Sequence, residues 1–376
     1  MSTFPRLFSV AAVALAAMAY AGCSSSSSPP SPQPTQVTDP TQLPPPAQGQ
    51  GVQLLTDLFT VPAGQELQVC YFFKVSDLLK AAGMDETKPL ELHRIQVVQE
   101  PGSHHMNLFR VRTIVNLDPA KGSPQVGVNG VGQCFVSSNW ADWPLVSNSQ
   151  QQGNQDWSYP DGVANELDPS ETLMLQTHYV NAATQTSDDG VGMVAINLYG
   201  MDPSAVQYQL GTVFATNQHI RVCESNPTPT YSTTCKMNSP SPVTVIGANG
   251  HFHSRGKEFD IYAWDGTSTS PPPDSQRFYQ SKTWSDPPML HSPDLEVQVP
   301  ANGGIWYTCS YDWQDPSQLT NGALTCGSLN AFDQKKYGTP AAQQDCCYTF
   351  GPQVDLNEHC NAFIYYYPKQ DNVNCF

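Results

Sequence analysis

The sequence is poor in charged residues, and basic residues are the scarcer kind. Lys and Arg number 17 against 33 Asp and Glu, which gives a formal net charge of −16. The 376 residues contain no basic cluster. Because binding to nucleic acid needs Lys and Arg to neutralise phosphates, this composition argues against a DNA- or RNA-binding protein.

Long apolar runs and helical periodicity are also scarce. Beyond the N-terminus no stretch reaches 18 apolar residues, so no other segment is expected to span a membrane. The 33 prolines and 26 glycines argue against a helical bundle, and only the short segment 75–83 has a helical pattern. Sixteen Tyr, fifteen Phe and seven Trp supply large apolar surfaces, which argues against a disordered acidic protein.

The N-terminus has the pattern of an export signal. Arg6 precedes an apolar run that ends near Met18, too short to span a bilayer comfortably, and two small residues then lead into Cys23. This resembles a bacterial lipobox, in which the cysteine carries the lipid. We therefore predict a lipoprotein signal peptide at 1–22, with a plain secretory signal as the alternative.

The segment 23–50 consists largely of Ser and Pro and has few apolar residues. Such a composition predicts a disordered tether, because the segment cannot bury a core. With no Asp after the lipidated cysteine, we expect an exported protein anchored to the bacterial outer membrane. The membrane would then be contacted only through the lipid.

The rest of the chain is a series of short runs rich in Val, Ile, Tyr, Phe and Thr, separated by turn residues. Many alternate apolar and polar residues, which is the period of half-buried strands. Their number and the length of the body predict two tandem β-sandwich domains, at 51–201 and 202–376, with the boundary in the turn MDPSAV. The runs are 67–75, 93–100, 106–115, 171–181, 191–200, 258–266, 295–304, 304–313 and 360–368.

Nine histidines occur, and their spacing suggests metal binding. His251 and His253 form an HxH pair, and positions i and i+2 of a strand point to the same face. His104 and His105 are adjacent, so both can face one metal only where a bulge or turn re-aims one ring, as the preceding Pro-Gly allows. Imidazole suits Zn, Cu, Fe and Ni, and without a Glu beside HxH zinc hydrolysis is not favoured over redox copper.

Four blocks in this order resemble the copper type II, ascorbate-dependent monooxygenases, which include peptidylglycine α-hydroxylating monooxygenase and dopamine β-monooxygenase. The resemblance covers about residues 65 to 368. The blocks are His104-His105-Met106, Gln176-Thr177-His178-Tyr179, HFHSRGK from His251 to Lys257, and Glu358-His359-Cys360-Asn361 with the aromatic run that follows.

The resemblance implies an all-β fold of two tandem eight-stranded, jelly-roll-like β-sandwiches, each holding one copper, that face each other across a solvent-filled cleft. His104, His105 and His178 would hold the first copper, which stores and passes an electron. His251 and His253 would hold the second, where O₂ binds and a C–H bond of the substrate is hydroxylated. Ascorbate or another one-electron donor would supply the electrons.

The third ligand of the second copper is a Met in the family, and the matching residue here is His359. A thioether stabilises Cu(I), whereas an imidazole favours Cu(II) and also suits zinc. We expect His359 to be a ligand and, with the HxH pair, part of the catalytic centre. The alternative is that His359 only lies nearby and the site has two ligands.

Four further positions match substrate-contacting or cleft positions of the family. Asn249 stands where the peptide enzyme has an Arg, and Phe363 stands where it has a Tyr. The missing Arg argues against a C-terminal peptide carboxylate, and the substrate class, small molecule or peptide, stays open. Asn361 and Gln176 are retained and could hold substrate and order cleft water, or could serve only in strand hydrogen bonding.

The eleven cysteines indicate an oxidising compartment. Without the lipid-bearing cysteine, ten remain, enough for five disulfides. The sequence has no CxxC spacing, which argues against a thiolate metal site. The resemblance implies Cys70–Cys134 and Cys309–Cys360, and Cys223–Cys235 is a plausible local pair. Cys326 would pair with Cys346 or Cys347, and the remaining one with Cys375.

Three functions fit these residues. The first is a copper monooxygenase that uses O₂ and a one-electron donor. The second is a copper-binding or copper-handling lipoprotein that lost the chemistry through the Met-to-His change. The third, a structural surface protein in which the histidines are relics, is the least consistent with intact HH, QxH and HxH blocks.

Overall fold

The computed structural model describes part of the chain. The described residues are 39–376 except 115–116, 137–142, 152, 184, 186, 320–323, 331–344, 372, 374 and 376. The predicted signal peptide, Cys23 and most of the predicted tether lie outside them. None of the helices among the described residues is long and apolar enough to cross a membrane.

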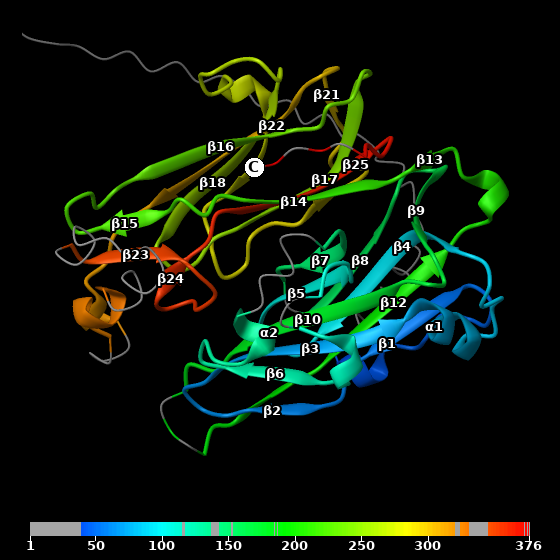
Figure 1. The fold of residues 1–376 in the computed structure, drawn as a ribbon, viewed down its shortest axis with the longest axis horizontal. Coiled ribbons are helices and arrows are strands. Elements are labelled where there is room, and N and C mark those ends of the chain that lie inside the picture. Colours follow the sequence, from blue (N-terminus) through cyan, green and yellow to red (C-terminus); the bar gives the residue numbers. More distant parts are fainter. Residues whose placement is uncertain are drawn as a thin grey trace, which may run out of the picture. The chain divides into compact units, whose positions relative to one another are not determined.

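The first half of the described chain folds into three sheets (Figure 1). The six-stranded sheet has the order β1 (Gly51–Leu55), β12 (Val194–Gly200), β4 (Leu90–Gln99), β9 (Val163–Leu167) and β13 (Tyr208–Gln209), with β8 (Gly153–Ser158) also paired to β4. The five-stranded sheet has the order β6 (Gln125–Val128), β3 (Glu66–Lys74), β10 (Thr172–Val180), β5 (Ser103–Arg110) and β7 (Leu145–Ser149). A two-stranded ribbon joins β2 (Phe59–Val61) and β11 (Gly190–Gly192).

The second half also forms three sheets. The five-stranded one has the order β14 (Gly211–Thr216), β25 (Asn361–Tyr367), β17 (Val243–His251) and β20 (Leu290–His291), with β21 (Val297–Val299) paired to β17. The four-stranded sheet runs β16 (Thr230–Lys236), β22 (Gly304–Tyr311), β18 (Gly256–Trp264), β19 (Arg277–Ser281). The three-stranded sheet runs β15 (Arg221–Cys223), β23 (Cys347–Phe350), β24 (Asn357–Glu358).

Helices are short. The helix expected at 75–83 is α1 (Val75–Ala81). Elsewhere in the described part of the chain, a short α-helical turn, α2, spans Gln133–Val136, and residues 326–330 are also helical. Five 3₁₀ turns begin at or next to Pro and lie at Pro40–Gln42, Pro119–Lys121, Pro203–Ala205, Asp274–Gln276 and Pro316–Gln318. The predicted domain boundary at 201–206 therefore falls on a 3₁₀ turn.

The expectation of two tandem eight-stranded β-sandwich domains is wrong. The strands divide among five sheets of three to six strands and one two-stranded ribbon, rather than among paired sheets of two equal domains. The core of the first half also takes in Ile246, Phe363 and Tyr365 from the second half, so the halves share packed side chains. Residues 37–376 accordingly form one compact unit.

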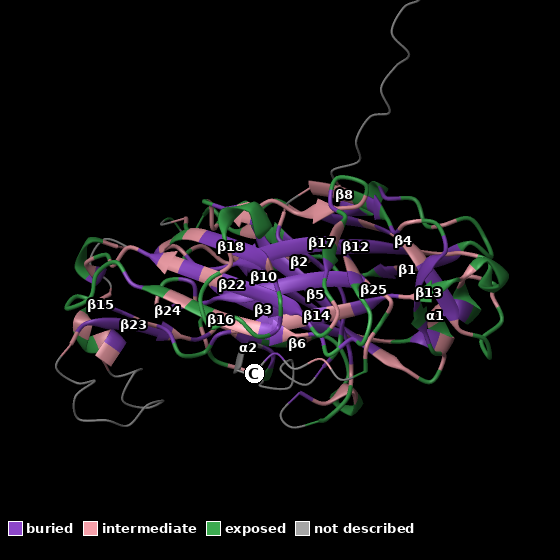
Figure 2. Ribbon diagram, turned by 90° about the horizontal axis from the view of Figure 1, so that it is seen from above, coloured by how far each residue is buried: buried purple, intermediate pink, exposed green. Residues whose placement is uncertain are grey.

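The central strands are buried along nearly their whole length (Figure 2). Every residue of β5 is buried, and so are all but one residue of β17 and all but the two ends of β10. Apolar side chains of these strands alternate with His, Asn and Gln, which face partners inside the protein rather than water. The candidate site is built on these strands.

The last part of the predicted tether lies against the body. Leu43 is 4% exposed and packs with Val98 and Ala195 of the six-stranded sheet. The amide of Gln53 donates to the Leu43 carbonyl at 3.0 Å, and Asn197 donates to the Pro44 carbonyl at 2.9 Å. The described segment from residue 39 to 50 is therefore held by the sheet.

Ten cysteines form five disulfides. Cys70–Cys134 and Cys309–Cys360 are confirmed, and Cys326 pairs with Cys346, one of the two partners expected. The predicted Cys223–Cys235 bond is wrong, and so is a bond between Cys347 and Cys375. The structure joins Cys223 to Cys347 and Cys235 to Cys375 instead.

Replacing Cys309 and Cys360 together by Ala should lower the free energy of unfolding by about 2–5 kcal/mol. Both residues are fully buried and lie 51 positions apart in the sequence. Cys309 is on β22 and Cys360 directly follows His359, so the bond ties the chain at His359 to β22. Urea unfolding followed by circular dichroism measures the change. A double variant within about 1 kcal/mol of the parent would show that this bond contributes little.

Candidate metal centre

The HH pair sits at a β-bulge. On β5, His105 pairs with His178 of β10, whereas the next pair along the ladder is Ser103 with Tyr179, so His104 is the extra residue. A bulge bends the strand and re-aims a side chain. The His104 and His105 rings are both buried, with centroids 5.1 Å apart. The re-aiming that the sequence required is therefore present.

His178 completes the first predicted set. It is fully buried on β10, and its ring centroid lies 4.9 Å from that of His105 and 5.1 Å from that of His104. Ligand nitrogens of the three residues lie within 4.8 Å of one another. The Nε2 atom of His178 is 2.7 Å from the Oε1 atom of Glu66, which begins β3 and fixes the orientation of the ring.

The HxH pair lies where β17 ends. His251 pairs with Asn361 of β25, and His253 follows two residues later, with ring centroids 5.3 Å apart. The turn after it depends on Gly256, because a Cβ there would stand 1.8 Å from the ring of Phe252. Nδ1 of His253 is 3.0 Å from the Asn357 carbonyl, a hydrogen bond that leaves Nε2 to face a metal.

A buried ion pair holds this segment. Arg255 and Glu358 have fully buried side chains, and Nε of Arg255 donates to Glu358 Oε1 at 2.7 Å. Glu358 also accepts the backbone N–H groups of His253 and Arg255, at 3.0 and 2.9 Å. The guanidinium donates in addition to the carbonyls of Val354, Asp355 and Asn357. Both the HxH turn and the chain leading to His359 are thereby fixed.

His359 lies beside the HxH pair. Its ring centroid is 4.3 Å from that of His253 and 5.2 Å from that of His251. The set of nitrogens within 4.8 Å of one another that includes HxH, however, contains His104 as its third member. The structure therefore brings the predicted ligand His359 next to the pair and also adds His104 to it.

The two predicted sets form one cluster, which we call the six-histidine cluster: His104, His105, His178, His251, His253 and His359. His104 belongs to both groups of three, and the His105 and His251 ring centroids are 5.1 Å apart. All six residues are 0–7% exposed. The family resemblance implied sites on opposite sides of a solvent-filled cleft, whereas here the histidines of both halves meet directly.

The charge state of the cluster suits a metal. Burial, with the neighbouring histidines as the second cause, holds the pKa of His104, His105, His251 and His253 well below the usual 6.5. The rings are therefore neutral near pH 7, the form that coordinates metals.

Several ring nitrogens of the cluster lack a hydrogen-bond partner among the described residues. They are Nε2 of His104, Nδ1 of His105, both nitrogens of His251 and Nε2 of His253. A buried polar atom without a partner costs about 1–3 kcal/mol, so a ligand for these atoms is expected. Metal–nitrogen bonds of about 2.0 Å place nitrogens on one ion about 3–4 Å apart, which a small contraction of each group would reach. The donor set therefore fits copper, as it also fits zinc.

Two of the four predicted substrate-binding residues have side chains that already pack or hydrogen-bond inside the fold. Phe363 is 1% exposed and stacks on Phe214, with ring centroids 4.9 Å apart. Gln176 accepts from Asn107 at 3.1 Å and donates to Gln68 at 2.9 Å. The structure therefore places Phe363 in the core and Gln176 in strand-to-strand hydrogen bonding.

The other two lie nearer the cluster. Asn249 is fully buried, donates to the Pro288 carbonyl at 3.1 Å and accepts from Asn148 at 3.3 Å. Asn361 lies opposite His251, and its Oδ1 has no hydrogen-bond partner among the described residues. Of the four, Asn361 is the residue best placed to contact a molecule bound at the cluster.

Sequence reasoning missed the residues that orient the histidines. Glu66 lies 112 positions before His178, so no local pattern links them. Arg255 and Glu358 stood within the quoted blocks, two positions after His253 and one before His359. A charged pair flanking metal ligands in otherwise apolar strands was the available signal. A further His/Cys/Asp/Glu group contains Cys223 and Cys347, whose sulfurs are already bonded to each other.

Comparisons with known proteins add little. No family model matches the chain, and no curated protein does. Among solved structures, the VP2 subviral particle of infectious bursal disease virus aligns over 89% of this chain and 85% of its own, at 10% identity and a TM-score of 0.14. A likeness that weak says nothing about fold or function.

Proposed function

We propose that the chain is a copper-dependent monooxygenase-like enzyme that uses O₂ and a one-electron donor such as ascorbate to hydroxylate a C–H bond. The observation that carries the proposal is the convergence of six buried histidines from both halves of the chain: five in the HH, QxH and HxH blocks, and His359. The resemblance of those blocks to the copper type II monooxygenases supports it. The proposal places two copper ions in one six-histidine cluster.

Each group around the cluster has a defined task in this proposal. Bound copper would supply one-electron redox chemistry and a binding place for O₂. Glu66 orients His178, and the Asn357 carbonyl fixes the proton of His253 on Nδ1. The burial of the cluster excludes bulk water from the reacting atoms. Asn361 donates or accepts a hydrogen bond to a molecule held beside His251.

Copper storage or delivery is the second candidate function. One observation favours it: all six rings are nearly inaccessible. The resemblance adds that His359 stands where the copper type II monooxygenases have a Met ligand. Three imidazoles around one ion stabilise Cu(II) more than a thioether does, which weakens the return to Cu(I) that turnover needs.

One experiment separates the two functions. Purified protein is loaded with Cu(II), its metal content is measured, and O₂ uptake is followed with ascorbate and a panel of amine, peptide and aromatic substrates. The enzyme function predicts about two copper ions per chain and O₂ uptake that rises with substrate, in proportion to hydroxylated product. Zinc-loaded protein is the control and should consume no O₂, because zinc has no redox chemistry.

The remaining outcomes decide against one or both functions. Two bound copper ions without product, in the parent and in His359→Met alike, would reject the enzyme and leave copper handling. Absence of bound copper would reject both.

A further inference from the structure

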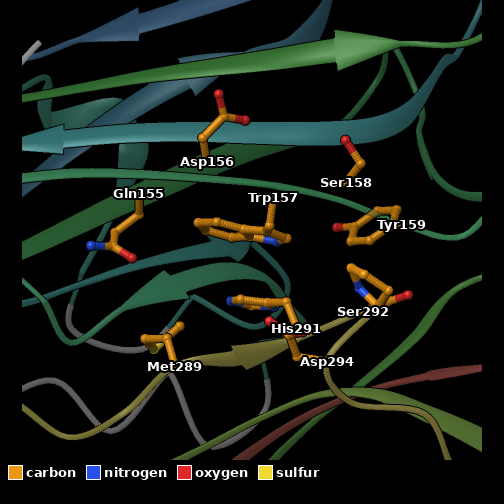
Figure 3. A pocket seen from close by; sticks show the side chains of 10 residues that line it. Gln155, Asp156, Trp157, Ser158, Tyr159, Met289, His291, Ser292 and Asp294 are labelled. Carbon is orange, nitrogen blue, oxygen red and sulfur yellow. The ribbon is translucent and has the colours of Figure 1, made fainter. Parts of the chain in front are cut away.

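A cavity lies away from the six-histidine cluster. It measures about 530 Å³ and is lined by the end of β8, by His291 of β20 and by residues next to these strands (Figure 3). On β17, the residue that pairs with His291 of this cavity is Gly247, four positions before His251. At about 3.3 Å per strand residue, about 13 Å of β17 separates Gly247, beside the cavity, from His251 of the six-histidine cluster. The cavity is therefore a site of its own.

One wall of the cavity is a pair of stacked rings. Trp157 of β8 and His291 of β20 lie face to face, with centroids 4.4 Å apart and planes 8° from parallel (Figure 3). Tyr159 adds a third aromatic side chain to the lining. Aromatic rings offer a large rigid apolar surface to a guest at little cost in conformational entropy.

Two nitrogens of this wall lack a hydrogen-bond partner among the described residues: Nε1 of Trp157 and Nε2 of His291. Burial lowers the pKa of His291 to about 3, so its ring is neutral near pH 7. The indole N–H can only donate. Both atoms are shielded from bulk water, so a guest that accepts from the indole and pairs with the imidazole nitrogen, with a small shift of the wall, recovers the lost hydrogen bonds.

The rim of the cavity instead carries hydrogen-bond acceptors and groups that can both donate and accept. Asp294 contributes an exposed carboxylate, Ser158 a hydroxyl and Gln155 an amide. The carboxylate of Asp156 is already held by Arg94, through bonds of 2.8 and 2.6 Å. The guest therefore meets the indole donor and an imidazole nitrogen at the ring wall, and acceptors at the rim.

We propose that this cavity binds an uncharged, polyhydroxylated small molecule, such as a sugar. Hydroxyl groups donate and accept, so one guest satisfies both the ring wall and the rim. An anion would be repelled by Asp294 and by the net charge of −16, and a cationic group facing the ring wall would leave the indole N–H unsatisfied. The volume lies in the ordinary range of small-molecule sites, about 300–1,000 Å³. This proposal is independent of the copper chemistry.

A matched set of sugars tests it. Purified protein is titrated with D-glucose, which is neutral, with D-glucosamine, which is a cation, and with D-glucuronate, which is an anion. Calorimetry or ligand-observed NMR should give a Kd for glucose of about 1 mM or tighter, with glucosamine and glucuronate at least about 10-fold weaker. Trp157→Phe keeps a ring but removes the N–H, and should weaken glucose about 10-fold.

Controls keep the result interpretable. Trp264→Phe makes the same change on β18, where Nε1 donates to the Ser268 carbonyl, and should leave glucose binding unchanged. If Trp157→Phe does not fold, the exposed Ser158→Ala replaces it, with an expected loss of a few-fold. No binding of any of the three sugars, tighter binding of a charged one, or equal binding by the Trp157 and Trp264 variants would overturn the proposal.

Discussion

His104→Ala should lower bound copper from about two ions per chain to less than one. His104 belongs to both groups of nitrogens that lie within 4.8 Å, and it stands at the bulge of β5 with rings of both halves around it. Removing it takes one ligand from each site, and loss of one imidazole from a three-ligand set leaves too few donors for tight binding. Mass spectrometry of metal content after gel filtration measures the effect.

Two control variants give this result its meaning. His219→Ala removes an exposed histidine outside the cluster and should keep both copper ions. His359→Ala removes a ring whose centroid lies 4.3 and 5.2 Å from those of the HxH pair, and it should cost at most one. If His104→Ala retained one full copper ion, the two sites would be independent, as the family resemblance implies. Thermal unfolding in EDTA checks that each variant folds.

The sequence predicted the strands better than their grouping. Alternation of apolar and polar residues depends on nearest neighbours in the chain, and the predicted runs 171–181 and 191–200 match β10 and β12 closely. Grouping into sheets depends on pairs far apart, such as β14 with β25 and β13 with β9. No local pattern encodes those pairs, so the expected two equal domains were wrong.

The disulfides show the same limit. Cys223 and Cys235 are close in sequence, which made a local bond plausible. In the structure, Cys223 on β15 stands directly opposite Cys347 on β23, and the two form the bond. The pairs that the resemblance implied, such as Cys309–Cys360, were confirmed because a resemblance carries long-range information that spacing does not.

The candidate site was also predictable in part. The need for a bulge at HH follows from strand periodicity, and the bulge is present. The HxH rings are neighbours as expected, but only His251 lies on the strand, because β17 ends there. The sharing of His104 between the two sets does not follow from it. That sharing depends on how β5 and β17, which come from different halves, approach each other, and only the folded chain determines this distance.

Arg255→Met should lower the free energy of unfolding by about 3–5 kcal/mol, because it leaves the carboxylate of Glu358 buried without its partner. Both side chains are fully buried, and burial already raises the pKa of Glu358. Met fills most of the volume but supplies none of the four hydrogen bonds that the Arg255 side chain donates. Urea unfolding of metal-free protein measures the difference.

A double variant identifies the cause. Arg255→Met combined with Glu358→Leu removes both charges, so it should recover a large part of the loss, although the backbone N–H groups that Glu358 accepts stay unpaired. Arg277→Met is the matched control: that ion pair with Asp260, at 3.3 Å, is partly exposed, so its loss should cost much less than the loss of Arg255. Equal losses in the single and double variants would assign the effect to packing. A recovery of the free energy of unfolding would show that the loss in Arg255→Met comes from the unpaired buried carboxylate of Glu358, the group that accepts the backbone N–H groups of the HxH turn.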